Sequence, residues 1–271
     1  MTPTTRLAVP GCTLAWSLID LTPPWLAAPE AIVMHHGIGA NQDLFAAWLP
    51  ALIHSHRILR FDMRGHGKSE RPDAGVAIDL ERLTDDLFAV MDVAGVERAH
   101  LLGESIGGTI VLSAALRAPD RVQTLTVSNG AHIGGSIQSV AGWQRMIEDQ
   151  GMEAWSAFMM RARFHPDAIS DAKWRWFQAQ QATACPDTVL RMLAALIGTD
   201  LTGKLPNLRP TLLLMHPDNS PFIPIPVMAG LRDLAPSAVL HVVGHARHGL
   251  PFSHATLCAG LLADFIHQQQ R

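Results

Sequence analysis

The sequence predicts one α/β domain with a mainly parallel sheet and a helical segment inserted into it, on three observations. Over about the first 130 residues, short apolar runs alternate with amphipathic segments, the order of strands and crossover helices in a parallel sheet. After Asn129 this alternation stops for about 70 residues and then resumes. Finally, a Gly-x-Ser-x-Gly motif at residues 103–107 lies between an apolar run and a helical segment.

The predicted strands are short runs rich in Val, Ile and Leu. Because helices cover both faces of a parallel sheet, its strands read as nearly continuous apolar segments. An early strand is expected at residues 14–20. Buried strands are expected at residues 31–36, 57–62, 100–104 and 122–128, and after the interruption at residues 211–215 and 238–243.

The clearest predicted helix covers residues 79–94. Its apolar positions recur at helical spacing and fall on one face, and Gly95 supplies the stop signal. We expect that face to pack on the sheet. Two further helices are expected near residues 227–234 and at the end of the chain, up to Phe265.

The interruption after Asn129 reads as an inserted helical cap. This stretch is rich in Trp, Met and Arg and carries no clear strand pattern. We place the cap at residues 132–205 and the core domain at residues 1–131 and 206–271.

Composition narrows the classes of partner. The chain has 271 residues, of which 48% are hydrophobic, enough for one large core. Its net charge of −3, from 21 basic and 24 acidic residues, provides no field of one sign for nucleic acid or anionic lipid. Cys12, Cys185 and Cys258 are widely separated and lack CxxC spacing, so we expect neither disulfides nor a zinc site. A small-molecule substrate is the expected partner.

The ends and apolar runs of the chain predict a soluble, cytoplasmic protein. Residues 1–6 lack the apolar run of a signal peptide, and no run of about 18 unbroken apolar residues occurs. The sequence leaves the oligomeric state open, with a homodimer as one option.

Ser105 is the predicted nucleophile. In the segment Gly-Glu-Ser-Ile-Gly-Gly at residues 103–108, the turn from strand to helix is so tight that glycine is needed beside the serine, which exposes its hydroxyl above the sheet. The amino terminus of the following helix favours developing negative charge. A serine of this kind needs a base, an acid to orient the base, and donors for the oxyanion.

The acid and the base are expected after the serine in the chain, on loops that follow late strands. Asp218 comes three residues after the apolar run that ends at Met215, and is the favoured acid. Asp200 and Asp233 are poorer candidates, because they lie at the cap junction or in a predicted helix. The candidate histidines lie within fourteen residues: His241, His245, His248 and His254.

Three segments together resemble the capped α/β-hydrolase superfamily over nearly the whole chain. They are His-Gly-Ile-Gly at residues 36–39, Asp-Met-Arg-Gly-His-Gly-Lys-Ser at residues 62–69, and the serine motif. The stretch 133–151, with Trp143, Arg145 and Gly151, is most similar to 3-oxoadipate enol-lactonases. The resemblance implies an α/β-hydrolase fold with an eight-stranded sheet, a cap, and no metal or organic cofactor.

The resemblance also assigns roles to single residues. It implies that the backbone N–H groups of Ile38 and Ile106 form the oxyanion hole, and that His66 has a structural role. His245 follows a glycine, as the catalytic histidine of the family usually does, but His248 stands at the family's usual distance from the final helix and is favoured. Met215 replaces a usual glycine, and Pro224 comes later than the family's proline, which suggests a small insertion near Asp218.

The predicted function is hydrolysis of a small ester or lactone through Ser105, His248 and Asp218 and an acyl-enzyme, with an enol-lactone or a carboxylate-bearing substrate favoured. In the cap, Trp143, Arg145 and Arg163 are the candidate substrate-binding residues, and an arginine that faces the pocket could pair with a substrate carboxylate. It is equally expected that these arginines lie on the outer faces of the helices and do not bind substrate. Three other functions stay open: hydrolytic C–C cleavage of a diketone, a cofactor-free dioxygenase that uses a His-Asp pair, and a ligand receptor.

Overall fold

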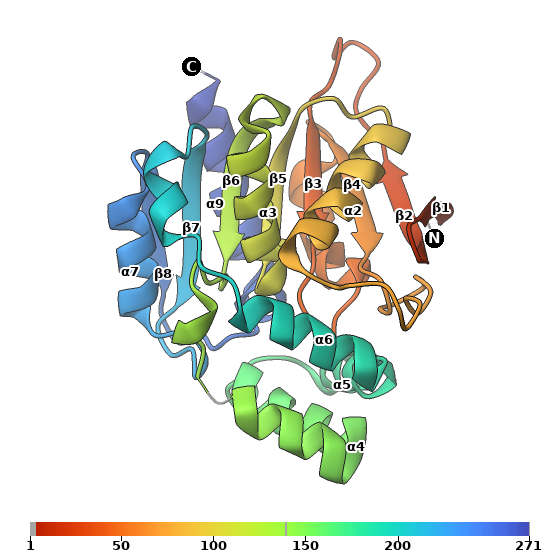
Figure 1. The fold of residues 1–271 in the computed structure, drawn as a ribbon. Helices are drawn as coiled ribbons and strands as arrows, with labels where there is room; N and C mark the ends of the chain where they lie inside the picture. Colours follow the sequence, from red (N-terminus) through yellow and green to blue (C-terminus); the bar gives the residue numbers. More distant parts are fainter. Residues whose placement is uncertain (1–3, 139, 271) are drawn as a thin grey trace.

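The structure, a computed structural model, describes residues 4–138 and 140–270, and its centre is an eight-stranded sheet (Figure 1). Its strands are β1 (Thr5–Val9), β2 (Cys12–Ile19), β3 (Ala31–His35), β4 (Arg57–Asp62), β5 (Ala99–Glu104), β6 (Val122–Ser128), β7 (Thr211–Pro217) and β8 (Ala238–Val243). They are ordered β1-β2-β4-β3-β5-β6-β7-β8. β2 pairs antiparallel with both β1 and β4, and all pairs from β4 to β8 are parallel.

The predicted mainly parallel, eight-stranded α/β architecture is confirmed, and each predicted strand lies within two residues of an observed one. The strand that sequence reasoning missed is β1. It forms a hairpin with β2 through a turn in which Gly11 has φ +67°, and it lies at the edge of the sheet with mostly exposed or half-buried side chains. An exposed edge strand has no apolar run to reveal it.

Helices cover both faces of the sheet (Figure 1). One face packs against α2 (Leu80–Val93), α3 (Ile106–Arg117) and α7 (Ile225–Leu234). The other packs against the 3-10 helix η1 (Gln42–Trp48), α1 (Leu49–Leu52), α8 (Leu250–Ser253) and α9 (Ala255–Gln269). The remaining short elements are η2 (Pro119–Arg121), η3 (Gly134–Ser136) and η4 (Thr202–Asn207).

The helix α2 has the signals that the sequence suggested. The Asp79 side chain accepts a hydrogen bond from the backbone N–H of Arg82 at 2.7 Å and caps the first turn. Leu83, Leu87 and Val90 are buried against the sheet. Gly95 follows at φ +65°, a conformation that ends a helix at little cost.

The segment between β6 and β7 forms three α-helices, besides η3 and η4, at the edge of the sheet where the parallel strands end (Figure 1). They are α4 (Val140–Arg163), α5 (Asp171–Thr183) and α6 (Pro186–Ile197), and all lie inside the predicted range 132–205. Gly151, at φ +82° and ψ +178°, breaks α4 into two pieces. Ile133 pairs with Asp200, so the two ends of the inserted segment meet. These helices therefore cover the edge at which loops of a parallel sheet gather.

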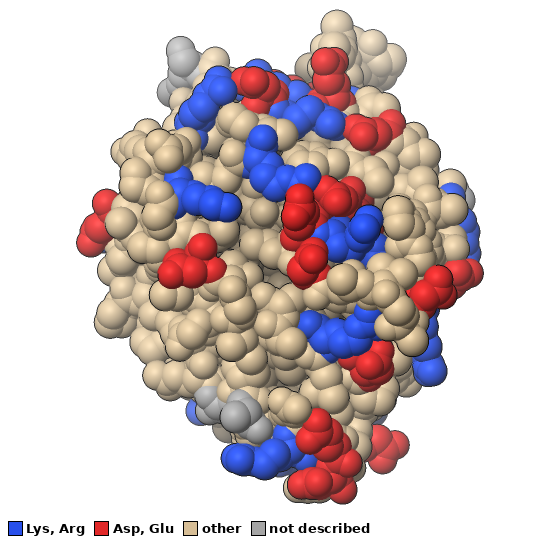
Figure 2. All heavy atoms as spheres, in the orientation of Figure 1, with Lys and Arg blue, Asp and Glu red and all other residues tan. Residues whose placement is uncertain are grey.

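The surface carries acidic and basic side chains side by side. Figure 2 shows them intermixed on the face drawn, without a broad field of one sign. Within residues 4–138 and 140–270, none of the helices has the length and apolar character that crossing a membrane requires.

Candidate active site

Ser105 stands on a strained turn between β5 and α3. Its backbone has φ +57° and ψ −123°, a region that costs a non-glycine residue about 1–3 kcal/mol. A Cβ atom on Gly103 would lie 2.2 Å from the carbonyl oxygen of Gly107, and one on Gly107 would lie 2.5 Å from that of His35. Both positions therefore need glycine, and the serine is held above the sheet edge at the start of α3.

The structure brings His248, and not His245, to this serine. The Nε2 atom of His248 lies 3.3 Å from Ser105 Oγ, and its backbone carbonyl accepts a hydrogen bond from Asn129 Nδ2 at 2.7 Å. Burial, with Arg163 and His216 nearby, holds the pKa of His248 well below its usual value. The ring is therefore neutral at physiological pH and has a lone pair for the serine proton. His245 is exposed, with φ +58°, and its ring stacks on that of His165 at a centroid distance of 4.7 Å.

The structure does not bring Asp218 to His248. Its carboxylate oxygens accept the backbone N–H groups of Ala246 and His245 at 3.0 and 2.8 Å, and the Ala246 N–H chiefly lowers the pKa of this carboxyl. The reason is local: Asp218 directly follows β7 and meets the loop that follows β8. The expected contact of this carboxylate with the imidazole is therefore replaced by a contact with backbone.

Ser220 occupies the place expected for the acid. Its Oγ lies 3.3 Å from His248 Nδ1, and it also accepts the backbone N–H groups of Phe222 and Ile223 at 3.4 and 3.2 Å. The Phe222 ring packs edge-on against the imidazole, with centroids 4.8 Å apart. Sequence reasoning missed Ser220 because it looked only for a carboxylate. The late position of Pro224 was interpreted as an insertion near Asp218. It was also the signal that the residue facing the histidine could lie later in this loop than Asp218.

The two predicted oxyanion donors flank the serine. Ile106 is the first residue of α3, so its N–H has no intrahelical acceptor. Ile38 lies in the loop after β3, and its carbonyl accepts a hydrogen bond from Arg163 Nη2 at 3.1 Å. His66 is buried and its Nδ1 contacts the carbonyl of Arg64 at 3.1 Å; its structural role stays a prediction.

A buried ion pair that sequence reasoning did not foresee lies beside the serine. Glu104 precedes Ser105, and its Oε1 lies 3.6 Å from Arg163 Nη1. Burial raises the pKa of Glu104 to about 7, although Arg163 and the N–H of Gly37 favour its ionised form. Burial likewise lowers the pKa of Arg163, whose Nε donates to Gln181 Oε1 at 3.1 Å. An acid at the end of the buried strand β5 was the sequence signal for such a pair.

An apolar cavity lies beside Ser105 and His248, with α4 and α6 forming part of its wall. Its empty volume is about 450 Å³, open solvent at its mouth included. Its lining combines core and cap residues: Ile38, Ser105, Ala131, Ile137, Trp143, Trp155, Met159, Arg163, Leu193, Leu196, Phe222, Ile223 and His248. The buried indole N–H groups of Trp143 and Trp155 have no hydrogen-bond partner among the described residues.

Two of the three predicted substrate-binding residues line this cavity, and the third does not. Trp143 and Arg163 line the cavity, whereas Arg145 is exposed on α4 and is not part of its lining. Trp155, buried and in the lining, was noted in the sequence only as part of the aromatic cap. Trp155 lies one helical turn before Met159, so both side chains are on the same side of α4. The sequence alone did not show which side of this helix faces the cavity.

A family model described as the alpha/beta hydrolase fold matches residues 30–255. The chain belongs to this family. As an α/β hydrolase it is 27% identical over 248 residues to the 2-hydroxymuconate semialdehyde hydrolase of Pseudomonas sp. (strain CF600), covering 87% of this chain and 86% of the relative. It is 26% identical over 250 residues to a protein of Caulobacter vibrioides named as a carbamate hydrolase, RutD, covering 89% and 91%.

A solved structure shows the same fold. The enol-lactonase from Burkholderia xenovorans LB400 superposes with a TM-score of 0.88 at 23% identity, covering 97% of this α/β hydrolase and all of that chain. The relatives are named for different hydrolytic reactions, so they agree on the hydrolase class and leave the substrate open.

Proposed function

We propose that this α/β hydrolase cleaves a small ester or lactone, with Ser105 as nucleophile and His248 as base. The observation that carries the proposal is the 3.3 Å approach of His248 Nε2 to Ser105 Oγ in the lining of an apolar cavity. Nucleophile and base within reach of each other, beside a cavity, are the signature of covalent catalysis.

The reaction follows from these positions. His248 Nε2 takes the proton of Ser105 Oγ as the oxygen attacks the substrate carbonyl carbon, and the N–H groups of Ile38 and Ile106 receive the oxyanion. The tetrahedral intermediate then expels the alcohol or enolate, which takes the proton from His248. An acyl ester on Ser105 remains. A water molecule, deprotonated by His248, attacks this ester. His248 then returns the proton to Ser105 Oγ as the acid leaves.

Ser220 is the proposed positioning residue for His248. A lone pair on Nε2 requires the proton on Nδ1, with Ser220 Oγ as its acceptor, a role that this oxygen shares with the longer contacts to the N–H groups of Phe222 and Ile223. A serine carries no charge, so the imidazolium formed during attack is less stabilised than beside a carboxylate. We therefore expect a working but slow enzyme.

The cavity favours a compact substrate with acceptor oxygens remote from the reacting carbonyl. Two unpaired indole N–H groups, on Trp143 and Trp155, can donate to such oxygens, and the rest of the lining is mostly apolar. Arg163 is held by Glu104, Gln181 and the Ile38 carbonyl. A substrate carboxylate would have to compete with Glu104 for it, so neutral lactones and esters fit better than anions.

Hydrolytic C–C cleavage is the second candidate. It is favoured by the likeness to the 2-hydroxymuconate semialdehyde hydrolase and uses the same serine and histidine. A cofactor-free dioxygenase needs a His-Asp pair, which the contact of His248 with Ser220 disfavours. Profiling with esters, lactones and vinylogous diketones, combined with oxygen-uptake measurements, distinguishes the three reactions.

The central experiment measures steady-state and single-turnover hydrolysis of a short p-nitrophenyl ester and of an enol lactone. Ser105→Ala and His248→Ala should each lose about a thousandfold or more in turnover, while His245→Ala should stay active. Retained turnover in Ser105→Ala would show that the serine is not the nucleophile. Arg163→Met tests the preference for neutral substrates. If Arg163 does not bind a substrate carboxylate, this change should leave the ratio of kcat/KM for neutral and carboxylate-bearing analogues nearly unchanged.

A further inference from the structure

A second cluster of chemically active side chains lies at the opposite edge of the sheet from Ser105. Glu30 directly precedes β3, His56 directly precedes β4, and His100 is the second residue of β5. These three strands are neighbours in the centre of the sheet, and each residue stands at or next to the amino end of its strand. One ligand atom from each of the three side chains lies within 4.8 Å of the other two.

We propose that Glu30, His56 and His100 form a binding site for a divalent transition-metal ion, with zinc as the best chemical match. Two imidazoles and a carboxylate are a ligand set that zinc prefers, and a fourth position is left for water. Tetrahedral bonds of about 2.0–2.2 Å place ligand atoms about 3.3 Å apart. Small side-chain rotations would therefore bring the three groups onto one ion.

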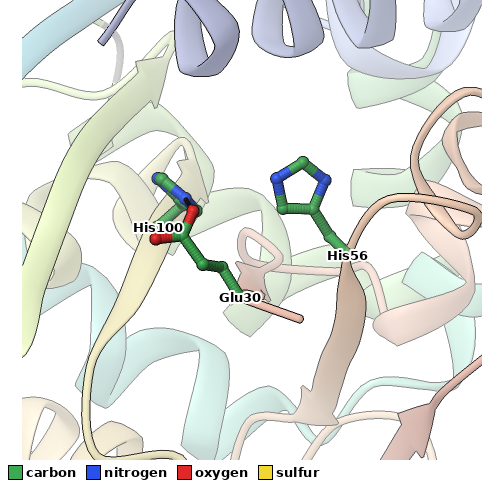
Figure 3. Close-up of side chains that lie close together, drawn as sticks. All are labelled: Glu30, His56 and His100. Carbon is green, nitrogen blue, oxygen red and sulfur yellow. Dashed lines mark hydrogen bonds and ion pairs between the residues drawn. The ribbon is translucent and has the colours of Figure 1, made fainter. Parts of the chain in front are cut away.

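The hydrogen bonds of His56 leave one of its nitrogens available. Ser55 Oγ donates to the carbonyl of Leu52 at 3.2 Å, so it accepts the proton on His56 Nδ1 at 2.8 Å. The Nε2 atom of His56 then carries a lone pair. Figure 3 shows one ring nitrogen of His56 turned to the side on which Glu30 and His100 lie. An outer partner that fixes the tautomer of a ligating histidine is the usual arrangement in metal sites.

His100 can exchange a proton for a metal without losing a partner. Its Nε2 lies 3.0 Å from Glu30 Oε2 and its Nδ1 lies 2.9 Å from Thr124 Oγ1. Without metal, Nε2–H donates to the carboxylate and Nδ1 accepts from the threonine. With metal on Nε2, the proton moves to Nδ1 and the threonine hydroxyl becomes the acceptor. The carboxylate would turn from a hydrogen-bond acceptor into a ligand.

The burial of the two histidines distinguishes this cluster from solvated side chains on the protein surface. His56 and His100 are only 7% and 3% exposed, so both imidazoles are shielded from bulk solvent and held by their neighbours. A metal ion would bind both rings in their neutral form. Glu30, which is about one-third exposed, is oriented by the amides of Gln123 and Gln270 and leaves a path for an ion to enter.

The role of such a site would be structural. It would join the amino ends of β4, β3 and β5, the strands that position the loops around Ser105 at their other ends. An ion that binds the folded chain and not the unfolded one raises stability in proportion to the logarithm of its concentration over Kd. The inference does not depend on the proposed reaction.

The test uses the untagged full-length chain, stripped of metal by a chelator and dialysed. Titration with Co²⁺ should give about one equivalent of binding with the intense visible bands of a tetrahedral ion, and Zn²⁺ should displace it. Zn²⁺ at a hundred times its Kd should raise Tm by roughly 5 °C or more. His56→Ala and Glu30→Gln should each abolish the Co²⁺ bands or weaken binding at least about tenfold.

Two control variants decide whether the cluster is responsible. His54→Ala removes an exposed histidine two residues away and should leave binding intact. The double variant His165→Ala/His245→Ala removes the stacked surface pair, which is the competing place for loose binding. If the bands persist in both His56→Ala and Glu30→Gln, or disappear with the surface pair, the site is wrong. Absence of Co²⁺ bands and of any Zn²⁺ effect on Tm would also overturn it.

Discussion

Ser220 Oγ lies 3.3 Å from His248 Nδ1, where a Ser-His-Asp triad would have a carboxylate. Asp218, two residues earlier, is bonded to backbone N–H groups of the loop after β8. Two residues therefore make contacts that a single aspartate could have made. Asp218 joins the loop after β7 to the loop after β8, and Ser220 contacts His248.

Ser220→Asp should speed the reaction. A carboxylate beside His248 Nδ1 would stabilise the imidazolium formed during attack, and we expect kcat/KM to rise about tenfold. It would also raise the pKa of His248, so the acid limb of the pH–rate profile should move to higher pH. Steady-state hydrolysis from pH 4 to 9 measures both effects.

Ser220→Ala is the matched control for that gain. It removes the acceptor for Nδ1–H without adding charge, so turnover should fall about tenfold while the fold persists. If the aspartate and alanine variants change turnover alike, the side chain at 220 does not act through the histidine.

Asp218→Ala should reduce stability more than catalysis. Its carboxylate bridges the loops after β7 and β8, and the backbone donors depress its pKa. This contribution to stability is present above the usual pKa of an aspartate and is lost as the pH falls through the depressed value. We expect a lower urea midpoint at pH 7, a smaller difference in strong acid, and turnover within about threefold of the wild type. A loss of turnover as large as that of His248→Ala would instead make Asp218 the catalytic acid.

The sheet was predictable from the sequence, and the partner of the histidine was not. Strands such as β3 and β7 are buried on both faces and read as apolar runs, whereas β1 is a five-residue edge strand whose side chains are exposed or half-buried. The serine turn was predictable because Gly103 and Gly107 are sterically required beside Ser105. These features depend on neighbours in sequence or on simple periodicity.

Contacts between segments that are distant in the sequence could not be predicted from neighbouring residues or from periodicity. Asp218 was the obvious acid by residue type and position, but which loop residue reaches His248 depends on how two loops meet after β7 and β8. Glu104 and Arg163 are 59 positions apart, and their pairing depends on how α4 folds over the sheet edge. The cluster of Glu30, His56 and His100 has no ligand spacing along the chain, so it becomes visible only when three strands lie side by side.

Glu104→Gln should change how stability depends on pH. Burial raises the pKa of Glu104 in the folded chain from the ordinary 4.5 to about 7, so the folded chain binds this proton more tightly than the unfolded chain does. Its contribution to stability is therefore complete below pH 4.5 and declines as the pH rises through 7. Because glutamine does not titrate, the wild type should lose stability relative to Glu104→Gln between pH 5 and pH 8. Urea unfolding at both pH values measures this, with Glu153→Gln, exposed on α4, as control. An equal difference at both pH values would mean that Glu104 is ionised throughout.

Trp155→Phe should weaken binding of substrates that carry a second acceptor oxygen. Trp155 lines the cavity, and its buried indole N–H has no partner among the described residues; phenylalanine keeps most of the apolar contact while removing that donor. Loss of one such hydrogen bond costs about 0.5–1.5 kcal/mol, which corresponds to a KM roughly two- to tenfold higher with kcat nearly unchanged. The comparison is between a lactone with a remote carbonyl or ether oxygen and an alkyl ester of similar size, whose KM should not rise. Trp25→Phe is the matched control, because that indole is 83% exposed and lies outside the cavity lining. Equal increases for both substrates would assign Trp155 a packing role and leave the donor without a function.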